Sequence, residues 1–434
     1  MTQLSRSKLQ ELVRYGAAAR TRVTLQPAAG EGTKVFPPTY AGAVYATEKR
    51  RLPGYPEPVD CVLLDSVQSQ ANRMEEALQQ AIDLGRIQLP VVEVDFTGFF
   101  PGDDKPEALR LLEPIGKVTS LQAPHRIVDA ILRDSIVVED NKQFRSKNER
   151  DESSYGQRLR RVTAQNATAL FELCPTALLL GMWDSTGPKG GLGAKFERAL
   201  VSEIVGINAV AGVRSSSRID PLAIQLEAGP VYLAKDGESA SWTLDASKAK
   251  LEKGSPLKVG KEGKPSEINH GNIKPDLKDK TGQPFHGGVT IDRAEQTIVL
   301  SFPALRRLKF PINGEAQSRP EVDIAARTML AALGLCAAAL AAEAGLDLRS
   351  RCLLWPTEPL KWELLGQPGQ MEKDIVLTAE QAVALLNDAI AAATAIGLPW
   401  RTTPLQLRPS DELVKLVVKS QQLAQQQGGE GGGE

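Results

Sequence analysis

The longest apolar stretch of the chain, residues 329–346, limits the fold more than any other feature. It reads MLAALGLCAAALAAEAGL, and its single charged residue, Glu343, lies close to its end. A stretch of this length forms either a membrane span or a helix that other elements of a large core surround. Because alanine dominates and Glu343 interrupts the stretch, we predict a buried helix over about 321–344. A chain of 434 residues that is 42% hydrophobic can build the core that such a helix requires.

Composition excludes several classes of protein. The four cysteines are far apart, form no CxxC pair and have only three histidines to assist them, so we expect reduced thiols, no metal site and no cofactor. The start of the chain, MTQLSRSKLQELVRYG, has no apolar core of signal-peptide length, which predicts a cytoplasmic protein without a membrane anchor. The net charge is −1, so nucleic-acid binding would depend on local basic patches.

Hydrophobic patterns predict an α+β fold. VDCVLLD at 59–65 is typical of a buried strand, and PVVEVDF at 90–96 is typical of a second one. Between them, Ser66 can cap a helix that runs to about Leu84. A second unit of the same kind follows later in the chain. It consists of a buried strand at 176–183, a glycine-rich loop, a helix from Ala194 to Gly206 and a strand from 207. Two such units make up a ferredoxin-like fold.

These patterns predict five segments along the chain. An N-terminal helix and strands that join the main α+β domain occupy 1–58, and this domain occupies 59–230, with a basic, solvated insertion at about 139–165. Residues 231–300 form an insertion. Residues 301–403 complete the main domain and add helices, the second of them at 378–396. Residues 404–434 form a C-terminal helix and a disordered Gln/Gly-rich tail.

The loop DSTGPKGGLGAKFER at 184–198 is the most informative stretch. Glycines let a backbone approach a ligand closely, and the N-terminus of a following helix attracts anions, so the loop predicts a phosphate site. The candidate residues are Lys189, Gly190, Gly191, Gly193, Lys195 and Arg198. A nucleotide-hydrolase motif would need lysine and then Ser or Thr directly after Gly193, and these are missing. An ordinary turn between a strand and a helix is the alternative.

Further candidates lie where polar residues follow buried segments. The helix that starts near Ser66 presents uncharged donors beside one arginine, which suits sugar and phosphate contacts, although a simple capped helix start explains the same residues. A predicted helix over 124–138, the basic segment and the turn RSSSRIDP supply others, each of which also has an ordinary structural explanation. These candidates are Gln68, Ser69, Asn72, Arg73, His125, Arg126, Lys142, Arg145, Lys147, Arg214 and Arg218.

The sequence offers no evident active site. It has no HExxH, GxSxG or paired-cysteine motif, and His125, His270 and His286 are isolated from nucleophiles. We therefore predict no catalytic residues and a protein that is not an enzyme.

Several motifs together resemble a known family. GLGAKFERALVSEI resembles the glycine-rich loop and basic helix of the RAMP superfamily, the RRM-like RNA-binding proteins of CRISPR systems. With LLDSVQSQANRMEEAL, APHRIVDAILRDS, MWDSTG and SSRIDPL, the chain is similar to the backbone subunit of the type I-G (formerly I-U) CRISPR interference complex. These motifs cover residues 59 to about 225.

The resemblance implies a right-hand-like architecture with an RRM-like palm, a helical insertion and a thumb hairpin. In this architecture residues 59–230 form the palm, residues 301–403 complete it, and the insertion at 231–300 could serve as thumb or finger. It also implies a protein that polymerises along the spacer of a CRISPR guide RNA without cutting. The expected partners are the guide RNA, target DNA through guide pairing, copies of the same chain in a helical filament and other subunits of the complex. Relatives in the superfamily cut RNA with a loop aspartate, so an RNA endonuclease remains an alternative. An enzyme that uses the glycine-rich loop on a phosphate ligand is a more distant one.

Overall fold

The computed structural model describes residues 4–42, 44–100, 105–185, 187, 193–235, 238, 240–277 and 286–428. The chain divides into two compact units. The first contains residues 1–103, 114–210 and 289–414, and the second contains 104–113, 211–288 and 415–434. Both α-helices and antiparallel strands are present, which confirms the predicted α+β class.

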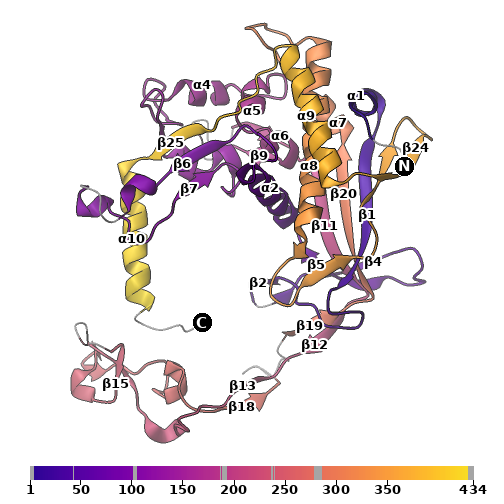
Figure 1. Cartoon of the computed structure of the whole chain (residues 1–434). Coiled ribbons are helices and arrows are strands. Elements are labelled where there is room, and N and C mark those ends of the chain that lie inside the picture. Colours follow the sequence, from indigo (N-terminus) through magenta and orange to yellow (C-terminus); the bar gives the residue numbers. More distant parts are fainter. Residues whose placement is uncertain are drawn as a thin grey trace. The chain divides into compact units, whose positions relative to one another are not determined.

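The first unit contains a nine-stranded antiparallel sheet (Figure 1). Its main path is β21-β22-β1-β20-β11-β5-β4, and β23 pairs with both β1 and β24. The strands are β1 (Ala18–Pro27), β4 (Thr47–Arg50), β5 (Val59–Asp65), β11 (Leu200–Ile207), β20 (Arg293–Ser301), β21 (Leu346–Asp347), β22 (Leu353–Pro356), β23 (Lys361–Leu365) and β24 (Met371–Val376). Segments from both ends of the chain therefore meet in this sheet.

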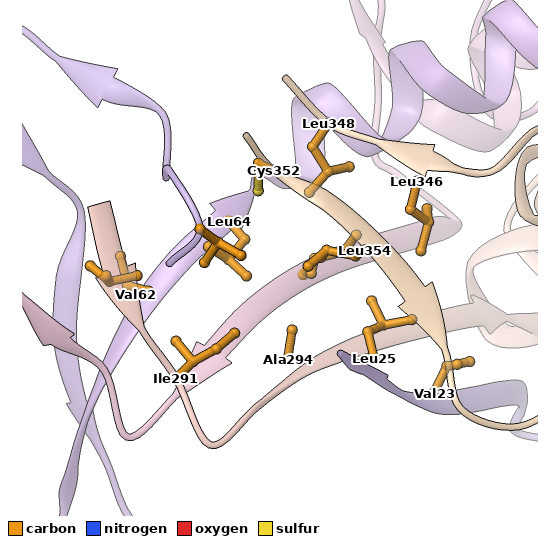
Figure 2. Close-up of a cluster of buried hydrophobic side chains, with 13 residues drawn as sticks. Val23, Leu25, Val62, Leu64, Ile291, Ala294, Leu346, Leu348, Cys352 and Leu354 are labelled. Atoms are coloured by element: carbon orange, nitrogen blue, oxygen red, sulfur yellow. The ribbon is translucent and has the colours of Figure 1, made fainter. Parts of the chain in front are cut away.

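One face of the sheet is apolar because apolar residues alternate with polar residues along each strand. In β1, Val23 and Leu25 are buried, whereas Arg22 and Thr24 are exposed. Figure 2 shows the resulting core, in which β1 contributes side chains beside those of β5, β20 and β22. Members of this cluster include Val23, Leu25, Val62, Leu64, Ile204, Ile291, Ala294, Leu346, Leu348, Cys352 and Leu354.

The apolar stretch identified from the sequence forms α8 (Pro320–Ala344), in which every residue from Ala326 to Leu340 is buried. It contacts α1 (Arg6–Tyr15), α2 (Val67–Asp83) and α9 (Ala379–Ala395). Small alanine side chains allow neighbouring helices to approach it on several sides. Although α8 is long and apolar enough to cross a membrane, 83% of its apolar window is buried, which is consistent with the core helix of a soluble protein.

A second sheet in the first unit has the strand order β7-β6-β25-β8. In it, β25 runs parallel to β6 and antiparallel to β8. The strands are β6 (Val92–Asp95), β7 (Lys117–Thr119), β8 (Ser135–Val137) and β25 (Leu405–Pro409). The predicted strands at 59–65 and 90–96 both exist, but they belong to different sheets. The short helices of this unit are α3 (Ala130–Arg133), α4 (Ser154–Arg160), α5 (Thr168–Leu173), α6 (Thr176–Leu180) and α7 (Phe302–Arg306).

The second unit contains several short strand pairs joined by loops. β13 (Ser216–Arg218) pairs with β18 (Ile273–Asp276), β14 (Tyr232–Leu233) with β15 (Trp242–Thr243), and β16 (Leu251–Glu252) with β17 (Ser255–Pro256). β12 (Val210–Val213) pairs with β19 (His286–Thr290). From α10 (Asp411–Gly428), the Gln421 amide oxygen accepts a hydrogen bond from the Leu112 N–H at 2.8 Å.

Two predictions around the glycine-rich loop are wrong. Residues 194–206, predicted as a helix, form β10 (Lys195–Phe196) and most of β11. In β11 the exposed Val201 is followed by the buried Ser202, which is the alternation of a strand. Ile204 and Ile207 are buried, and their β-branched side chains favour a strand. These two preferences outweigh the apparent helical spacing of the apolar residues. Residues 176–183, predicted as a strand, form α6 and then β9 (Met182–Trp183). A fully buried apolar run is compatible with either structure.

Two more predictions need correction. The helix predicted over 124–138 is a 3₁₀ turn (Arg126–Val128), then α3, then β8, because the Asp129 side chain caps a new short helix. The tail predicted to be flexible is helical as far as Gly428, since glutamine is a good helix former. Residues 429–434 lie outside the described residues.

Candidate nucleic-acid interface

The start of α2 has the geometry that the sequence predicts. Ser66 is the N-cap, and its hydroxyl oxygen accepts a hydrogen bond from the Ser69 N–H at 3.2 Å. Gln68 and Asn72 are exposed in the first two turns, and Ser69 and Arg73 are half-buried. The first turn of a helix has N–H groups without helical acceptors and a partial positive charge, so this surface can accept an anion.

A buried carboxylate fixes arginines beside this helix start. Asp65 is fully buried at the end of β5. Its Oδ2 accepts hydrogen bonds from Arg73 Nε at 3.0 Å and from Gln70 Nε2 at 2.6 Å, and its Oδ1 accepts one from Arg349 Nη2 at 3.3 Å. Arg73 Nη2 also donates to the Leu348 carbonyl at 2.6 Å. One buried negative charge therefore orients two guanidinium groups, each of which is about a quarter exposed.

A third arginine extends this group. Arg351 lies, like Arg349, in the loop between β21 and β22, and its guanidinium is 4.1 Å from the centre of the Phe36 ring. We call Asp65, Arg73, Arg349 and Arg351 the arginine cluster. The cluster has three cations for one carboxylate and is therefore locally positive, and Asp65 holds two of these cations, Arg73 and Arg349, at the start of α2. Sequence reasoning missed Arg349 and Arg351. The two arginines in DLRSRC indicate a basic loop, but the sequence cannot show that this loop contacts Asp65 and Arg73.

Further along α2, Glu75 forms a buried ion pair with Arg126. Arg126 Nε and Nη2 each donate to a Glu75 carboxylate oxygen at 2.7 Å, and Arg126 Nη1 donates to the Gly181 carbonyl at 3.0 Å. Burial raises the pKa of Glu75 to about 7, although the charge of Arg126 opposes that rise. Because Arg126 is only 7% exposed, it holds α2 against the 3₁₀ turn rather than presenting a free cation. The neighbouring His125 is exposed.

Arg198 adds a positive charge that is not fully compensated. Partial burial and the nearby charge of Arg126 both lower the pKa of Arg198, and only Glu75 opposes them. Two guanidinium groups therefore share one carboxylate at this position. An anion near Arg198 would relieve the repulsion.

The glycine-rich loop connects two strands instead of a strand and a helix. β9 and β10 pair with Trp183 opposite Lys195, and the Asp184 N–H donates to the Ala194 carbonyl at 3.0 Å. No helix N-terminus follows, so the dipole part of the phosphate-loop prediction is wrong. Lys195 Nζ lies 5.5 Å from the ring centre of Trp183, which is 55% exposed. Lys189, Gly190 and Gly191 lie outside the described residues.

Gly193 has a structural role in this hairpin. A Cβ atom there would lie 1.8 Å from the Asp184 carbonyl oxygen, so only glycine fits at the base of the loop. This contact explains Gly193 without a ligand.

The basic insertion is anchored rather than fully solvated. Arg145 is 3% exposed, and its Nη2 donates to Asp184 Oδ2 at 2.7 Å. The ion pair fixes the segment to the base of the β9–β10 loop, so the prediction of a solvated arm is wrong at Arg145. Lys142 and Lys147 are exposed.

Arg214 and Arg218 belong to the second unit. Arg214 is exposed and Arg218, on β13, is half-buried. Within the described part of the chain, no group of three His, Cys, Asp or Glu residues could hold a metal ion.

Comparison with known proteins gives one result. A family model described as CRISPR-associated protein GSU0053 matches residues 20–211, which include α2, the buried Glu75–Arg126 pair and the β9–β10 hairpin. No curated protein matches the chain. The match supports a CRISPR-associated protein that works in a CRISPR complex.

Proposed function

We propose that this chain is a non-catalytic subunit that binds a CRISPR guide RNA and polymerises along its spacer in a type I interference complex. The observation that carries the proposal is the arginine cluster at the N-terminus of α2, in a chain similar to a CRISPR-associated family. In this role the protein holds the guide while the guide pairs with target DNA.

The chemistry of the cluster suits a guide of any sequence. Guanidinium groups and helix N–H groups bind phosphates, and Gln68 and Asn72 can donate to or accept from the 2′-hydroxyl of a ribose. None of these contacts depends on the base. A scaffold of this kind leaves base edges free, because in RNA-guided effectors sequence is read by pairing.

The strand order supports an RRM-like palm. β22, β1, β20 and β11 are neighbours in that order, α2 lies between β1 and β11 in the chain, and α8 lies between β20 and β22. A ferredoxin-like fold has the same order of elements, 4-1-3-2, with a helix after its first and third strands. In this interpretation β5 and β4 extend the sheet beyond its second strand.

We further propose that copies of the chain form a helical filament with other subunits of the complex, and that the second unit serves as thumb or finger. Several apolar residues of that unit are largely exposed, Ile219 at 88% and Leu222 at 70%. Exposed apolar residues of this size favour a role in assembly.

The ion pairs disfavour an RNA endonuclease. The two aspartates that could serve it, Asp65 and Asp184, are both nearly fully buried and paired with arginine. A catalytic metal needs carboxylates that are free to coordinate it. The hairpin likewise disfavours a phosphate-ligand enzyme, since the loop has no helix N-terminus to hold a transferring phosphate.

The proposal is tested by expressing the chain with a guide and partner subunits and measuring the nucleic acid that copurifies. We expect RNA of uniform length with the wild-type protein. A variant with Arg351→Gln, Gln68→Ala and Asn72→Ala, which breaks no ion pair, should retain much less RNA. Arg14→Gln, an exposed change on α1, is the matched control. Wild-type protein free of RNA would contradict the proposal.

A further inference from the structure

A pocket lies beside the base of the β9–β10 loop. It has a volume of about 440 Å³ and belongs entirely to the first unit. Its lining residues are Arg133, Asp134, Gln143, Arg145, Ser146, Lys147 and Gly187. Pockets of 300 to 1,000 Å³ are typical of small-ligand sites, so about 440 Å³ is enough for a phosphorylated group.

The guanidinium of Arg145 forms a buried wall of this pocket. Asp184 accepts a hydrogen bond from its Nη2 at 2.7 Å, and Glu152 Oε1 lies 3.6 Å from its Nε. That Nε has no hydrogen-bond partner among the described residues. Glu152 is instead hydrogen-bonded to Arg160, whose Nε and Nη2 donate to its Oε2 at 2.9 and 2.6 Å. Two carboxylates therefore orient Arg145, yet its buried Nε–H has no hydrogen-bond acceptor among the described residues.

Two more cations reach the pocket. Arg133 is held flat against Asp134, with its Nε and Nη2 donating at 2.8 and 2.7 Å. Lys147 is exposed, and no described residue forms an ion pair with it. Gln143 and Ser146 add uncharged polar groups between them. A carboxylate that fixes an arginine preorganises it for an anion, because the fixed donors lose little entropy when the anion binds.

We propose that this pocket binds a single phosphate group, with Arg145 as its buried wall, Arg133 as a second oriented guanidinium and Lys147 as an exposed cation. Only the source of the phosphate rests on the proposed function: in that role it would be a backbone phosphate of the guide RNA. Free phosphate-bearing ligands share the same chemistry, so the experiment separates the two sources.

The test uses full-length protein stripped of nucleic acid, with isothermal titration of inorganic phosphate and, separately, of a short single-stranded RNA. Arg133→Gln and Lys147→Gln each remove one cation at the rim and leave the buried pair of Arg145 intact. Arg150→Gln is the matched control, since Arg150 is an exposed arginine of the same segment that does not line the pocket. Circular dichroism of each variant checks that it is folded.

We expect one phosphate per chain, weakened about tenfold by each rim variant and unchanged by Arg150→Gln, because one charge-assisted hydrogen bond is lost each time. If the rim variants also weaken RNA binding, the phosphate is that of the RNA. If they weaken phosphate binding alone, the pocket takes a free ligand. The proposed function would then depend only on RNA binding by the arginine cluster. The proposal would be overturned if phosphate binding did not saturate, or if the rim variants bound phosphate with the same affinity as the wild type.

Discussion

The start of α2 and the β9–β10 loop carry similar residue types, yet the chain uses them differently. Both follow a buried segment and both present lysine or arginine with small or polar neighbours. At α2 a real helix begins, and Asp65 binds Arg73 of that helix and Arg349 of a loop 284 residues away in sequence. At β9–β10 a second strand follows, and Asp184 instead meets the glycines of its own loop and Arg145. A glycine-rich loop is therefore an anion site only if the next element supplies the dipole or the cations.

The largest effect on stability is expected at the buried ion pair between Glu75 of α2 and Arg126. Arg126→Leu leaves Glu75 buried without a partner, so it should lower the free energy of unfolding by about 3 to 5 kcal/mol. Urea denaturation followed by circular dichroism measures the change. Arg126→Leu combined with Glu75→Leu should recover most of the loss, and a single variant as stable as wild type would contradict the buried pair.

The next effect concerns RNA binding at α2. Replacing Arg73 and Arg349 with Gln, together with Asp65→Asn to avoid an unpaired charge, should weaken RNA binding about 100-fold, since two charge-assisted contacts are lost. The slope of log affinity against log salt should fall by about 0.7 for each phosphate contact removed. Fluorescence anisotropy at several salt concentrations measures both, and Asp65→Asn alone serves as control. An unchanged slope would mean that the arginine cluster does not touch phosphate.

A smaller effect is expected at the base of the hairpin. Gly193→Ala forces its Cβ against the Asp184 carbonyl, so it should cost about 1 to 3 kcal/mol of stability through local strain. RNA affinity measured below the unfolding transition should change little. Gly366→Ala is a useful control, because neither glycine has a positive φ and a Cβ at Gly366 would lie no closer than 3.4 Å to its neighbours. Lost RNA affinity in a stable Gly193→Ala protein would instead indicate a ligand role for the glycine.

The smallest effect is expected from the cations of the hairpin. Lys195→Gln with Arg198→Gln should weaken RNA binding only about threefold, because no helix dipole or buried carboxylate preorganises these side chains. The same anisotropy assay compares this variant with the α2 variant. An effect as large as that of the α2 variant would reverse the ranking of the two regions.

The sequence predicted the α2 region well because its signals are local. A buried strand, a capping serine and a helical apolar period all lie within residues 59–84, and each is present in the structure. The long apolar stretch of α8 was an equally clear signal. These features depend on neighbours along the chain, which periodicity and capping report directly.

What the sequence could not predict depends on contacts between distant segments. Arg349 joins the site only because β22 pairs with β1 and brings its loop to the end of β5. Arg126 and Arg145 looked like surface cations, but Glu75 and Asp184 bury them as ion pairs. At 200–207 the apolar residues fit a helical spacing as well as a strand, and pairing with β20 and β5 decides for the strand.

The most direct test of the central claim is ultraviolet crosslinking of the assembled complex, followed by mass spectrometry of peptides joined to guide RNA. The account predicts crosslinks within peptides that contain Gln68 to Arg73 and Arg349 to Arg351, at many spacer positions and without base preference. Crosslinks confined to other surfaces of the chain, or none in a complex that contains intact guide, would contradict it.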